Sequence, residues 1–260
     1  MGPRRTIVLL GLAALFLSAG HAFARNHWWM YEREMQDPIN DPPDAEVPAE
    51  FKFGRLRYPS FRYGRWATDA NKGERLFLVA LRRLSLVNAQ SIEEVVNMEG
   101  DEMYDSPFLY AVAAGDWRLT NENAKMLGKF LERGGFLVVD DLHNDREWAD
   151  FMDGIDQAIP GAVDEEIPDD DAIFHVTFDI SDRIMISGYN IVRGQPYERG
   201  GYVARWRAIR DKKARIVAAG WHNQDLGDAW EWADAPEYPE NLSNRAFRFG
   251  VNYVIYAMTH

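Results

Sequence analysis

Apolar and polar positions follow two different rhythms along the chain after residue 50. Apolar runs at 108–113 and 136–139 predict buried strands, and 51–58 also has strand character before it stops at Pro59. The segments 71–85 and 121–133 instead repeat apolar residues every three or four positions, as helices do. Strands and helices in this order predict an α/β fold, with a mostly parallel sheet and helices on both faces.

The predicted helices have recognisable starts. Thr120 is a good N-cap for the second helix, and Asp145 opens a third. A last helix, capped by Ser243 or Asn244, runs to the end of the chain. In the first helix, the apolar spacing predicts a buried face made of Leu76, Val79, Ala80 and Leu84.

The remaining segments carry weaker patterns. A short strand is predicted at 91–97, and the segments 202–209 and 215–219 suit the two strands of a hairpin. The segment 162–200 has no regular period. The segment 223–240, with the sequence NQDLGDAWEWADAPEYPE, combines carboxylates with aromatic rings and is expected to be a loop before the last helix.

The first 24 residues have the features of a secretory signal peptide. Arg4 and Arg5 precede an apolar run at 7–19, and Ala22-Phe23-Ala24 has small residues around a cleavage site after Ala24. The run is shorter than the roughly 20 residues of a membrane span, although an uncleaved anchor is the alternative. We therefore expect a periplasmic or otherwise exported protein with no stable membrane span after cleavage.

Three regions follow from these patterns. Residues 1–24 are the signal peptide, and residues 25–50 form an extended lead-in rich in Pro and acidic residues. Residues 51–260 are expected to form a single α/β domain, a length that supports one large hydrophobic core.

The charge of the chain limits its partners. The formal net charge is −12, and removing residues 1–24 takes away two Arg and no acid, which leaves −14. Such a surface repels nucleic acid and anionic lipid but suits a divalent cation. The chain has no Cys, which excludes disulfides, thiolate catalysis and Cys-ligated zinc.

The end of the strand at 136–139 carries the sharpest group of candidate catalytic residues. Asp140, Asp141 and His143 follow this strand, and ligands of open α/β sheets bind beyond the carboxyl ends of strands. Two adjacent carboxylates can hold a metal or act as acid and base, and His143 could be a ligand or a base. The alternative is that Asp141 or Asp145 caps the next helix and His143 is solvated.

Two further segments supply candidate ligand-binding residues. The first strand and the turn after it bring polar and aromatic groups to the same edge, and the acid-rich segment adds carboxylates spaced as oxygen ligands for a hard cation. The alternative for the second segment is that its Trp rings plug the core while its acids face water. The candidates are Arg57, Tyr58, Trp66 and Asp69 from the first segment, and Asn223, Asp225, Asp228, Trp230, Glu231 and Trp232 from the second.

Several common catalytic motifs are missing. The sequence has no G-x-S-x-G, no H-E-x-x-H, no Walker A motif and no G-x-G-x-x-G. A serine hydrolase, a zinc protease of that type, a P-loop enzyme and a simple dinucleotide enzyme therefore lose their usual sequence support.

Six blocks of the sequence together resemble one bacterial family, the domain of unknown function 4159. They are Phe53-x-Arg55-Leu56-Arg57-Tyr58, Trp66-Ala67-Thr68-Asp69, Ser106-Pro107-Phe108-Leu109-Tyr110, Gly134-Gly135-Phe136 to Asp141, Asp225-Leu226-Gly227-Asp228 to Ala233, and the ending Gly250 to His260. The resemblance covers about residues 51–260. It implies a branch of the class I glutamine-amidotransferase-like group with a flavodoxin-like sandwich, although this chain lacks the Cys nucleophile of the amidotransferases.

These observations leave alternative functions. The first is a ligand- or partner-binding module of the cell envelope, whose polar ligand could be a glycan because sugar rings stack on aromatics and hydrogen-bond to acids. The second is a metal-assisted or acid/base hydrolase acting on a glycan or an amide, with Asp140, Asp141 and His143 carrying the reaction. A structural role in an envelope complex is the third. The hydrolase gains support if Asp141, His143 and an acid from 225–231 meet in one site.

Overall fold

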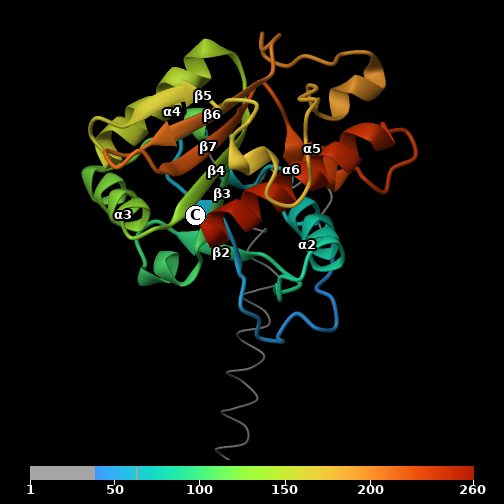
Figure 1. Ribbon diagram of the computed structural model, residues 1–260, viewed down its shortest axis with the longest axis horizontal. Coiled ribbons are helices and arrows are strands. Elements are labelled where there is room, and N and C mark those ends of the chain that lie inside the picture. Colours follow the sequence, from blue (N-terminus) through green and yellow to red (C-terminus); the bar gives the residue numbers. More distant parts are fainter. Residues whose placement is uncertain (1–38, 63) are drawn as a thin grey trace, which may run out of the picture.

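A computed structural model of the chain describes residues 39–62 and 64–260. A seven-stranded sheet runs through its centre in the order β2-β1-β3-β4-β7-β6-β5 (Figure 1). The predicted signal peptide and its cleavage site lie outside the described residues. The strands are β1 (Phe53–Arg57), β2 (Glu94–Asn97), β3 (Phe108–Val112), β4 (Phe136–Leu142), β5 (Val163–Glu166), β6 (Arg205–Arg210) and β7 (Ile216–His222).

The sheet is mostly parallel, as the sequence predicts. Strands β2, β1, β3, β4 and β7 run parallel to one another, whereas β6 is antiparallel to β7 and β5 is antiparallel to β6. The predicted hairpin at 202–219 is confirmed as β6 and β7. Its turn is closed by Asp211, whose carboxylate accepts hydrogen bonds from the backbone N–H groups of Lys213 and Arg215.

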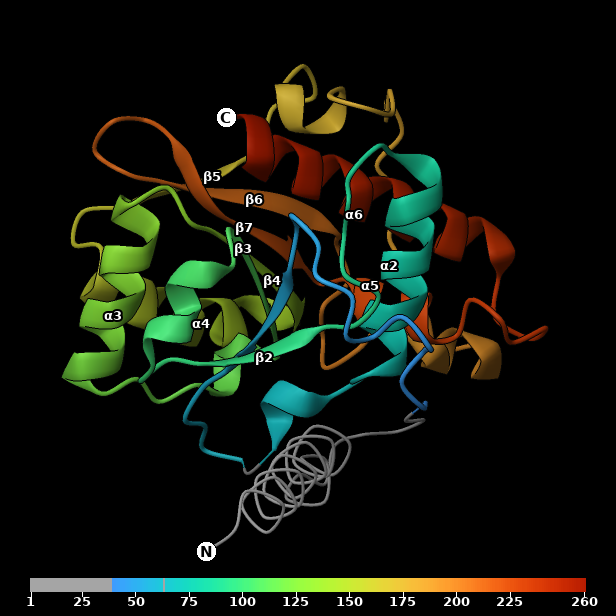
Figure 2. The ribbon, with the colours of Figure 1, turned by 90° about the horizontal axis from the view of Figure 1, so that it is seen from below.

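Helices cover both faces of the sheet (Figure 2). On one face lie α2 (Lys72–Leu84), α5 (Leu226–Glu231) and α6 (Glu240–Thr259), and on the other lie α3 (Asn121–Glu132) and α4 (Asn144–Ala158). Side chains of a strand point alternately to the two faces, so each inner strand serves two cores. In β3, Phe108 and Tyr110 join the core under α2 and α6, while Leu109 joins the core under α3 and α4.

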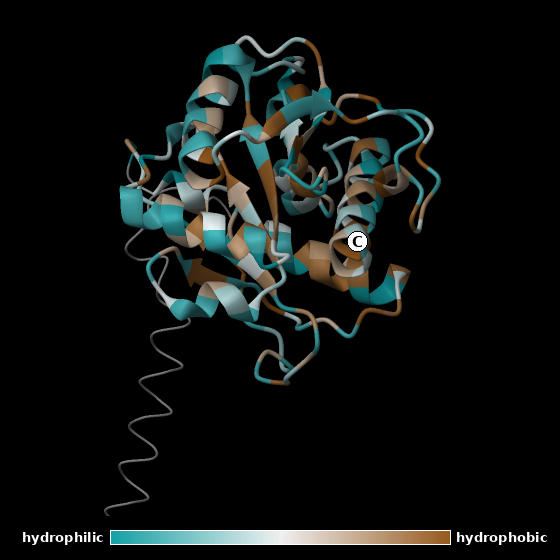
Figure 3. Cartoon of the chain, turned by 60° about the vertical axis from the view of Figure 1, so that its left-hand side comes forward, coloured by the Kyte–Doolittle hydropathy of each residue, from teal (hydrophilic) through white to brown (hydrophobic). Residues whose placement is uncertain are grey.

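Hydrophobic residues concentrate on the inner strands, and hydrophilic ones on the loops and outer helix surfaces (Figure 3). Helices α5 and α6 add aromatic rings to the core that lies under α2. Trp221, Trp230 and Tyr253 meet there, with ring centroids 5.1 to 5.7 Å apart. With no disulfide available, this aromatic packing is a main source of stability.

Several predicted elements need correction. The helix α2 is confirmed, but its buried apolar face is Phe77, Leu78 and Leu81, while Val79 and Leu84 are exposed. The run at 76–81 is apolar throughout, so its periodicity alone could not choose the face. The last helix begins at Glu240 rather than after Ser243 or Asn244, and Ser243 is buried inside it.

Two elements went unpredicted because their sequences are short and acidic. Strand β5 forms the outer edge of the sheet, where its carboxylates pair with arginines of β6: Arg207 Nε lies 2.8 Å from Asp164 Oδ1, and Arg210 Nε lies 2.5 Å from Glu165 Oε1. Helix α5 lies within the segment expected to be a loop. Its N-cap is Asp225, whose side chain accepts a hydrogen bond from the backbone N–H of Asp228.

A buried ion pair attaches the first strand to α2. Arg55 of β1 pairs with Glu74, and its guanidinium also donates to the carbonyl oxygens of Trp66 and Thr68. Arg55 and Glu74 are both almost fully buried. Because a buried charge is tolerated only with a partner and satisfied hydrogen bonds, this pair fixes the turn 65–69 against the sheet edge.

The end of the lead-in also packs against α2. Arg75 hydrogen-bonds to the carbonyl of Ile39 at 2.7 Å and to Asp41 Oδ1 at 2.5 Å, and Arg82 Nη1 lies 2.8 Å from Asp44 Oδ2. Among the described residues, no helix has the length and apolar composition that a membrane span needs.

Candidate functional site

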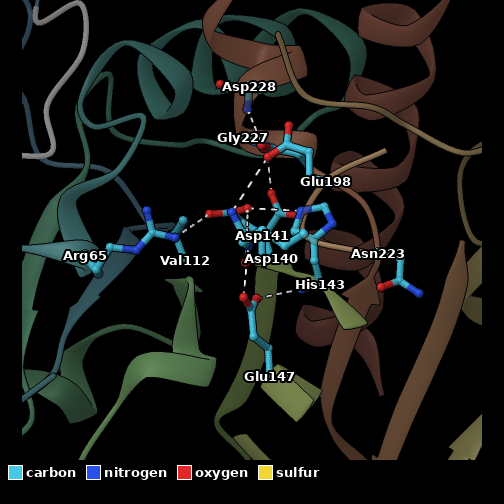
Figure 4. A network of polar contacts seen from close by, with 12 residues as sticks. Arg65, Val112, Asp140, Asp141, His143, Glu147, Glu198, Asn223, Gly227 and Asp228 are labelled. Atoms are coloured by element: carbon cyan, nitrogen blue, oxygen red, sulfur yellow. Dashed lines mark hydrogen bonds and ion pairs between the residues drawn. The ribbon is translucent and has the colours of Figure 1, made fainter. Parts of the chain in front are cut away.

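The candidate site lies at the carboxyl ends of the parallel strands. Strand β4 bulges against β7 there, because three residue steps from Val139 to Leu142 match two steps from Gly220 to His222. The bulge carries Asp141 in the left-handed conformation, with φ of 52°. As a result the adjacent Asp140 and Asp141 have different surroundings (Figure 4).

Asp140 is a buried hydrogen-bond hub. Its carboxylate accepts hydrogen bonds from the Tyr110 hydroxyl at 2.7 Å and from the backbone N–H groups of Leu226 and Gly227 at 3.1 and 2.7 Å. Burial raises the pKa of Asp140 to about 6, while these hydrogen bonds act in the opposite direction. With no exposed surface and all its contacts internal, Asp140 serves to position α5.

Asp141 lies between two guanidinium groups and an imidazole. Its Oδ1 accepts from Arg199 Nη2 at 2.6 Å and lies 3.1 Å from His143 Nε2, and its Oδ2 lies 3.2 Å from Arg65 Nη2. Although burial favours the neutral acid, Arg199 and then His143 hold the pKa of Asp141 well below its usual range. Asp141 is therefore an ionised carboxylate that fixes the imidazole of His143.

His143 is almost fully buried and has one ring nitrogen in use. Nε2 contacts Asp141, whereas Nδ1 has no hydrogen-bond partner among the described residues. The expected alternative, that Asp141 or Asp145 caps α4, is wrong. The capping carboxamide belongs to Asn144, which accepts from the backbone N–H groups of Arg146 and Glu147 at 2.9 and 3.1 Å.

Next to this group is an acid cluster, which we define as Asp69, Glu198, Asp225, Asp228 and Glu231. Ligand oxygens of Glu198, Asp225 and Asp228 lie within 4.8 Å of one another, and so do those of Asp69, Asp228 and Glu231. Glu198 is also within 4.8 Å of ligand atoms of Asp141 and His143, which joins the acid cluster to the imidazole.

Four members of the acid cluster are buried, and Glu198 is partly buried. Among the described residues, no Lys or Arg pairs with Asp225 or Asp228. Burial, followed by the charge of Asp228, raises the pKa of both Asp69 and Asp225 well above the ordinary value. Burial also raises the pKa of Asp228 and of Glu198. A buried carboxylate without a counter-charge must take up a proton or bind a cation.

The two carboxylate oxygens of Asp228 have different surroundings. Its Oδ2 accepts a hydrogen bond from the backbone N–H of Tyr189 at 2.5 Å, but its buried Oδ1 has no hydrogen-bond partner among the described residues. A side chain at Gly188 would place its Cβ 2.3 to 2.8 Å from oxygens of Glu198, Asp225 and Asp228. The glycine thus leaves room where three carboxylates converge.

The backbone around the site adopts sparsely populated conformations. Six of the seven non-Gly residues with positive φ in the described part of the chain belong to this edge, which indicates that the conformation is imposed by the site. They are Asp69, Ala113, Asp141, Asn144, Arg199 and Asn223.

Asn223 connects three segments at this edge. Its Oδ1 accepts from the backbone N–H of Asn144 at 2.7 Å, and its Nδ2 donates to the Val203 carbonyl at 2.7 Å. It therefore holds the end of β7, the start of α4 and the loop after 200 together. Both its polar atoms are occupied, so we assign it a positioning role.

The two tryptophans of the acid-rich segment have different environments. Trp230 is buried and stacks on Phe77 at 4.5 Å between ring centroids, as the core alternative predicts. Trp232 is only partly buried and stacks on Tyr189 at 4.1 Å. The same alternative also predicts that the acids face water. This part is wrong, because Asp225, Asp228 and Glu231 are all buried.

Three of the expected binding residues lie apart from the acid cluster. Arg57, Tyr58 and Trp66 line a separate cleft of about 580 Å³ beside the ends of β1 and β2. Trp66 and Tyr58 are themselves buried, and Tyr58 donates to the Val112 carbonyl. The structure therefore brings together only part of the predicted set.

Three functional residues were missed by sequence reasoning. Arg65 and Arg199 hold Asp141, and Glu198 completes two groups of ligands. Arg199 and Gly200 are the left-handed centre of a tight turn in which the Gly201 N–H bonds to the Glu198 carbonyl at 2.7 Å. The Gly-Gly pair signals a turn, but nothing local indicates that the turn folds over the sheet edge.

His222, at the end of β7, is buried and neutral. Its ring stacks on Trp148 at 5.0 Å, and its Nε2 donates to the Asn144 carbonyl at 3.0 Å. Burial lowers the pKa of His222 to about 4. The residue supports the start of α4 and takes no part in the acid cluster.

The fold and the site define a mixed α/β domain with buried acids at the carboxyl edge of its parallel strands. The chain belongs to the family described as domain of unknown function (DUF4159), whose sequence model matches residues 52–258. The family resemblance of the six sequence blocks is thereby confirmed. A comparison with curated proteins gave no match.

Replacing Asp140 with Ala should destabilise the protein strongly. The change removes the acceptor of three buried donors, and each unsatisfied donor costs about 1–3 kcal/mol, so we expect a loss of at least about 3 kcal/mol in the free energy of unfolding. Urea denaturation would measure it, with Glu122→Gln on α3 as an exposed control. A loss below about 1 kcal/mol would contradict the positioning role.

The neutral state of His222 predicts a pH dependence. Because its pKa is about 4 in the folded protein and 6.5 ordinarily, the unfolded chain binds the extra proton between these values. The free energy of unfolding should therefore fall as the pH is lowered through this window. His222→Phe, which retains a ring against Trp148, should show a shallower fall than the wild type.

An NMR titration of the His222 ring provides the direct measurement. The ring should remain neutral until the pH approaches about 4. A midpoint near 6.5 would show that the folded protein accepts the charged ring and would disprove the assignment.

Proposed function

We propose that this protein is an exported binding domain of the cell envelope that uses a divalent cation to hold a polar ligand. The observation that carries the proposal is the convergence of Glu198, Asp225 and Asp228 within 4.8 Å, with the buried Oδ1 of Asp228 lacking a hydrogen-bond partner among the described residues. Export rests on the signal-like features of residues 1–24.

The chemistry of the donors selects the kind of cation. Carboxylate oxygens are ligands for hard ions such as Ca²⁺, Mg²⁺ and Mn²⁺, and these ions keep open positions for water or for oxygens of a ligand. The cation would offset the charge of Asp225 and Asp228, which no basic side chain in the described region neutralises. The cation site is thus formed by residues that are costly to bury without it.

Aromatic rings beside the acid cluster favour a glycan as the polar ligand. Tyr197 and Tyr202 are exposed, pack at 5.5 Å between ring centroids, and flank Glu198 in the chain. Tyr189, whose backbone N–H bonds to Asp228, stacks on the partly buried Trp232. Sugar rings stack on such surfaces while their hydroxyl groups can coordinate a bound cation.

The strand order supports a flavodoxin-like classification. Strands β2, β1, β3, β4 and β7 are parallel and adjacent in this order, which matches the order 2-1-3-4-5 of flavodoxin-like sheets. We propose that the domain is a branch of the glutamine-amidotransferase-like group. The absence of Cys separates it from amidotransferase chemistry, so the kinship concerns the fold.

A second candidate function is metal-assisted hydrolysis of a glycan or an amide. Its specific support is the pair of Asp141 and His143, in which an ionised carboxylate orients an imidazole whose Nδ1 lacks a partner in the described structure. The imidazole could take a proton from an attacking water, and the leaving oxygen or nitrogen would then accept it. Glu198 would connect this base to the cation.

Cation binding should be visible as a change in melting temperature. The purified protein is treated with EDTA and heated with Ca²⁺, Mg²⁺ or Mn²⁺. At an ion concentration of about 100 times Kd, binding to the folded state adds about 2.7 kcal/mol, which corresponds to roughly 5–10 °C for a chain of this size. No change with any ion would disprove the proposal.

Two variants make this experiment specific. Asp228→Asn should melt at a higher temperature than the wild type in EDTA, because it removes a buried charge, and should no longer respond to the ion. Glu122→Gln, on the exposed surface of α3, should respond as the wild type does. A response retained in full by Asp228→Asn would place the cation elsewhere.

Hydrolysis is tested separately with chromogenic glycosides and amides in the presence of Mn²⁺. If His143 is the base, His143→Gln should lower the rate by about 100-fold or more while keeping the cation-induced rise in melting temperature. Equal rates for the variant and the wild type, or no turnover of either substrate class, would exclude this candidate.

A further inference from the structure

Asp228 belongs to two groups of ligands at once. Its carboxylate converges with Glu198 and Asp225 on one side, and with Asp69 and Glu231 on the other, in each case with ligand oxygens within 4.8 Å. Its two oxygens differ: Oδ2 accepts the Tyr189 N–H, while the buried Oδ1 has no partner among the described residues. One carboxylate with this position can bridge two ions.

We propose that the acid cluster holds two divalent cations, with Asp228 as the bridging carboxylate. This inference rests on the proposed function, because the first ion is the one held by Glu198, Asp225 and Asp228. The second ion is bound by Asp69, Asp228 and Glu231. Paired ions about 3.5–4 Å apart act as a clamp for a ligand that offers two oxygens.

The chemistry of the acid cluster suits hard cations. Its ligand atoms are carboxylate oxygens; Asp69, Asp225, Asp228 and Glu231 are buried, and Glu198, whose carboxylate lies 3.7 Å from Arg199 Nη1, is partly buried. Ca²⁺, Mg²⁺ and Mn²⁺ are the ions whose preferred ligands match.

Two glycines allow the carboxylates to approach so closely. Gly188 faces the first group, where a Cβ would lie 2.3 Å from Glu198 Oε1 and 2.7 Å from Asp228 Oδ2. Gly227 faces the second, where a Cβ would lie 2.6 Å from Asp69 Oδ2. Neither glycine needs positive φ, so each is required for space at the ligand oxygens.

The imidazole of His143 lies next to the proposed two-cation centre. His143 Nδ1 lacks a hydrogen-bond partner in the described structure, and His143 is almost fully buried. It converges with Asp141 and Glu198. Arg65 and Arg199 already neutralise Asp141, so this group suits contact with the ligand better than it suits another cation.

The number of bound ions tests the inference. Protein stripped with EDTA is titrated with Mn²⁺ alone, the bound metal is measured after gel filtration, and the EPR spectrum is recorded. We expect two Mn²⁺ per chain and the spectrum of an exchange-coupled pair. One Mn²⁺ per chain, or two without coupling, would overturn the bridged centre and leave the proposed function standing. No bound Mn²⁺ would overturn both.

Variants assign each ion to its ligands. Glu231→Gln should lose the second ion, bind one Mn²⁺ and lose the coupled spectrum. Asp225→Asn should lower the affinity for the first ion and likewise lose the coupled spectrum. Gly227→Ala provides a steric version of the first change, because its methyl group would lie 2.6 Å from Asp69 Oδ2, as well as 2.8 Å from the Tyr110 hydroxyl. Glu122→Gln should retain two coupled ions.

A circular dichroism spectrum and a cooperative melting curve confirm that each variant is folded before the metal is counted. If Glu231→Gln and Gly227→Ala both fold and both retain a coupled pair, the second ion is bound elsewhere and the inference is wrong.

Discussion

The carboxylate of Asp140 is the contact on which the site depends. It lies inside the sheet, yet it accepts hydrogen bonds from a neighbouring strand through Tyr110 and from the first N–H groups of α5. A helix N-terminus favours a nearby negative charge, so the carboxylate of Asp140 holds the N-terminus of the short helix α5 against the sheet. The acids that α5 carries, Asp228 and Glu231, are thereby placed over the strand ends.

A second constraint follows from this placement. The carboxylates near α5 are buried, but only some of them form ion pairs with basic residues. Asp141 has two guanidinium groups, whereas Asp225 and Asp228 have none in the described structure. The same edge therefore holds one carboxylate that is permanently ionised and others that require a proton or a cation. This difference separates a residue that orients an imidazole from the residues that we propose bind a cation.

The fold was more accessible to sequence reasoning than the site. Strands β3 and β4 are continuous apolar runs, and Thr120 forms the capping interaction predicted for α3, because these signals are local. The face of α2 could not be chosen, since the apolar run at 76–81 has no single period. Strand β5 is too acidic to show a strand pattern, as its residues are neutralised by arginines from β6.

The site itself depends on contacts between distant residues. Asp141 and His143 were predicted because they follow a buried strand. Glu198 and Arg65 were not, because they lie on turns whose positions are set by the packing of the rest of the chain. The different roles of Asp140 and Asp141 follow from a single bulge in β4, a feature that depends on pairing with β7 and that no local pattern in the strand reveals.

The two edges of the sheet have a consequence for the resistance of the protein to aggregation. An exposed strand edge is a template on which another chain can add a strand and begin an aggregate. Here one edge is β2, which has four residues, and the other is β5, whose acids are paired with arginines. Short and charged edge strands disfavour pairing with another chain. The sheet itself therefore protects the protein against aggregation.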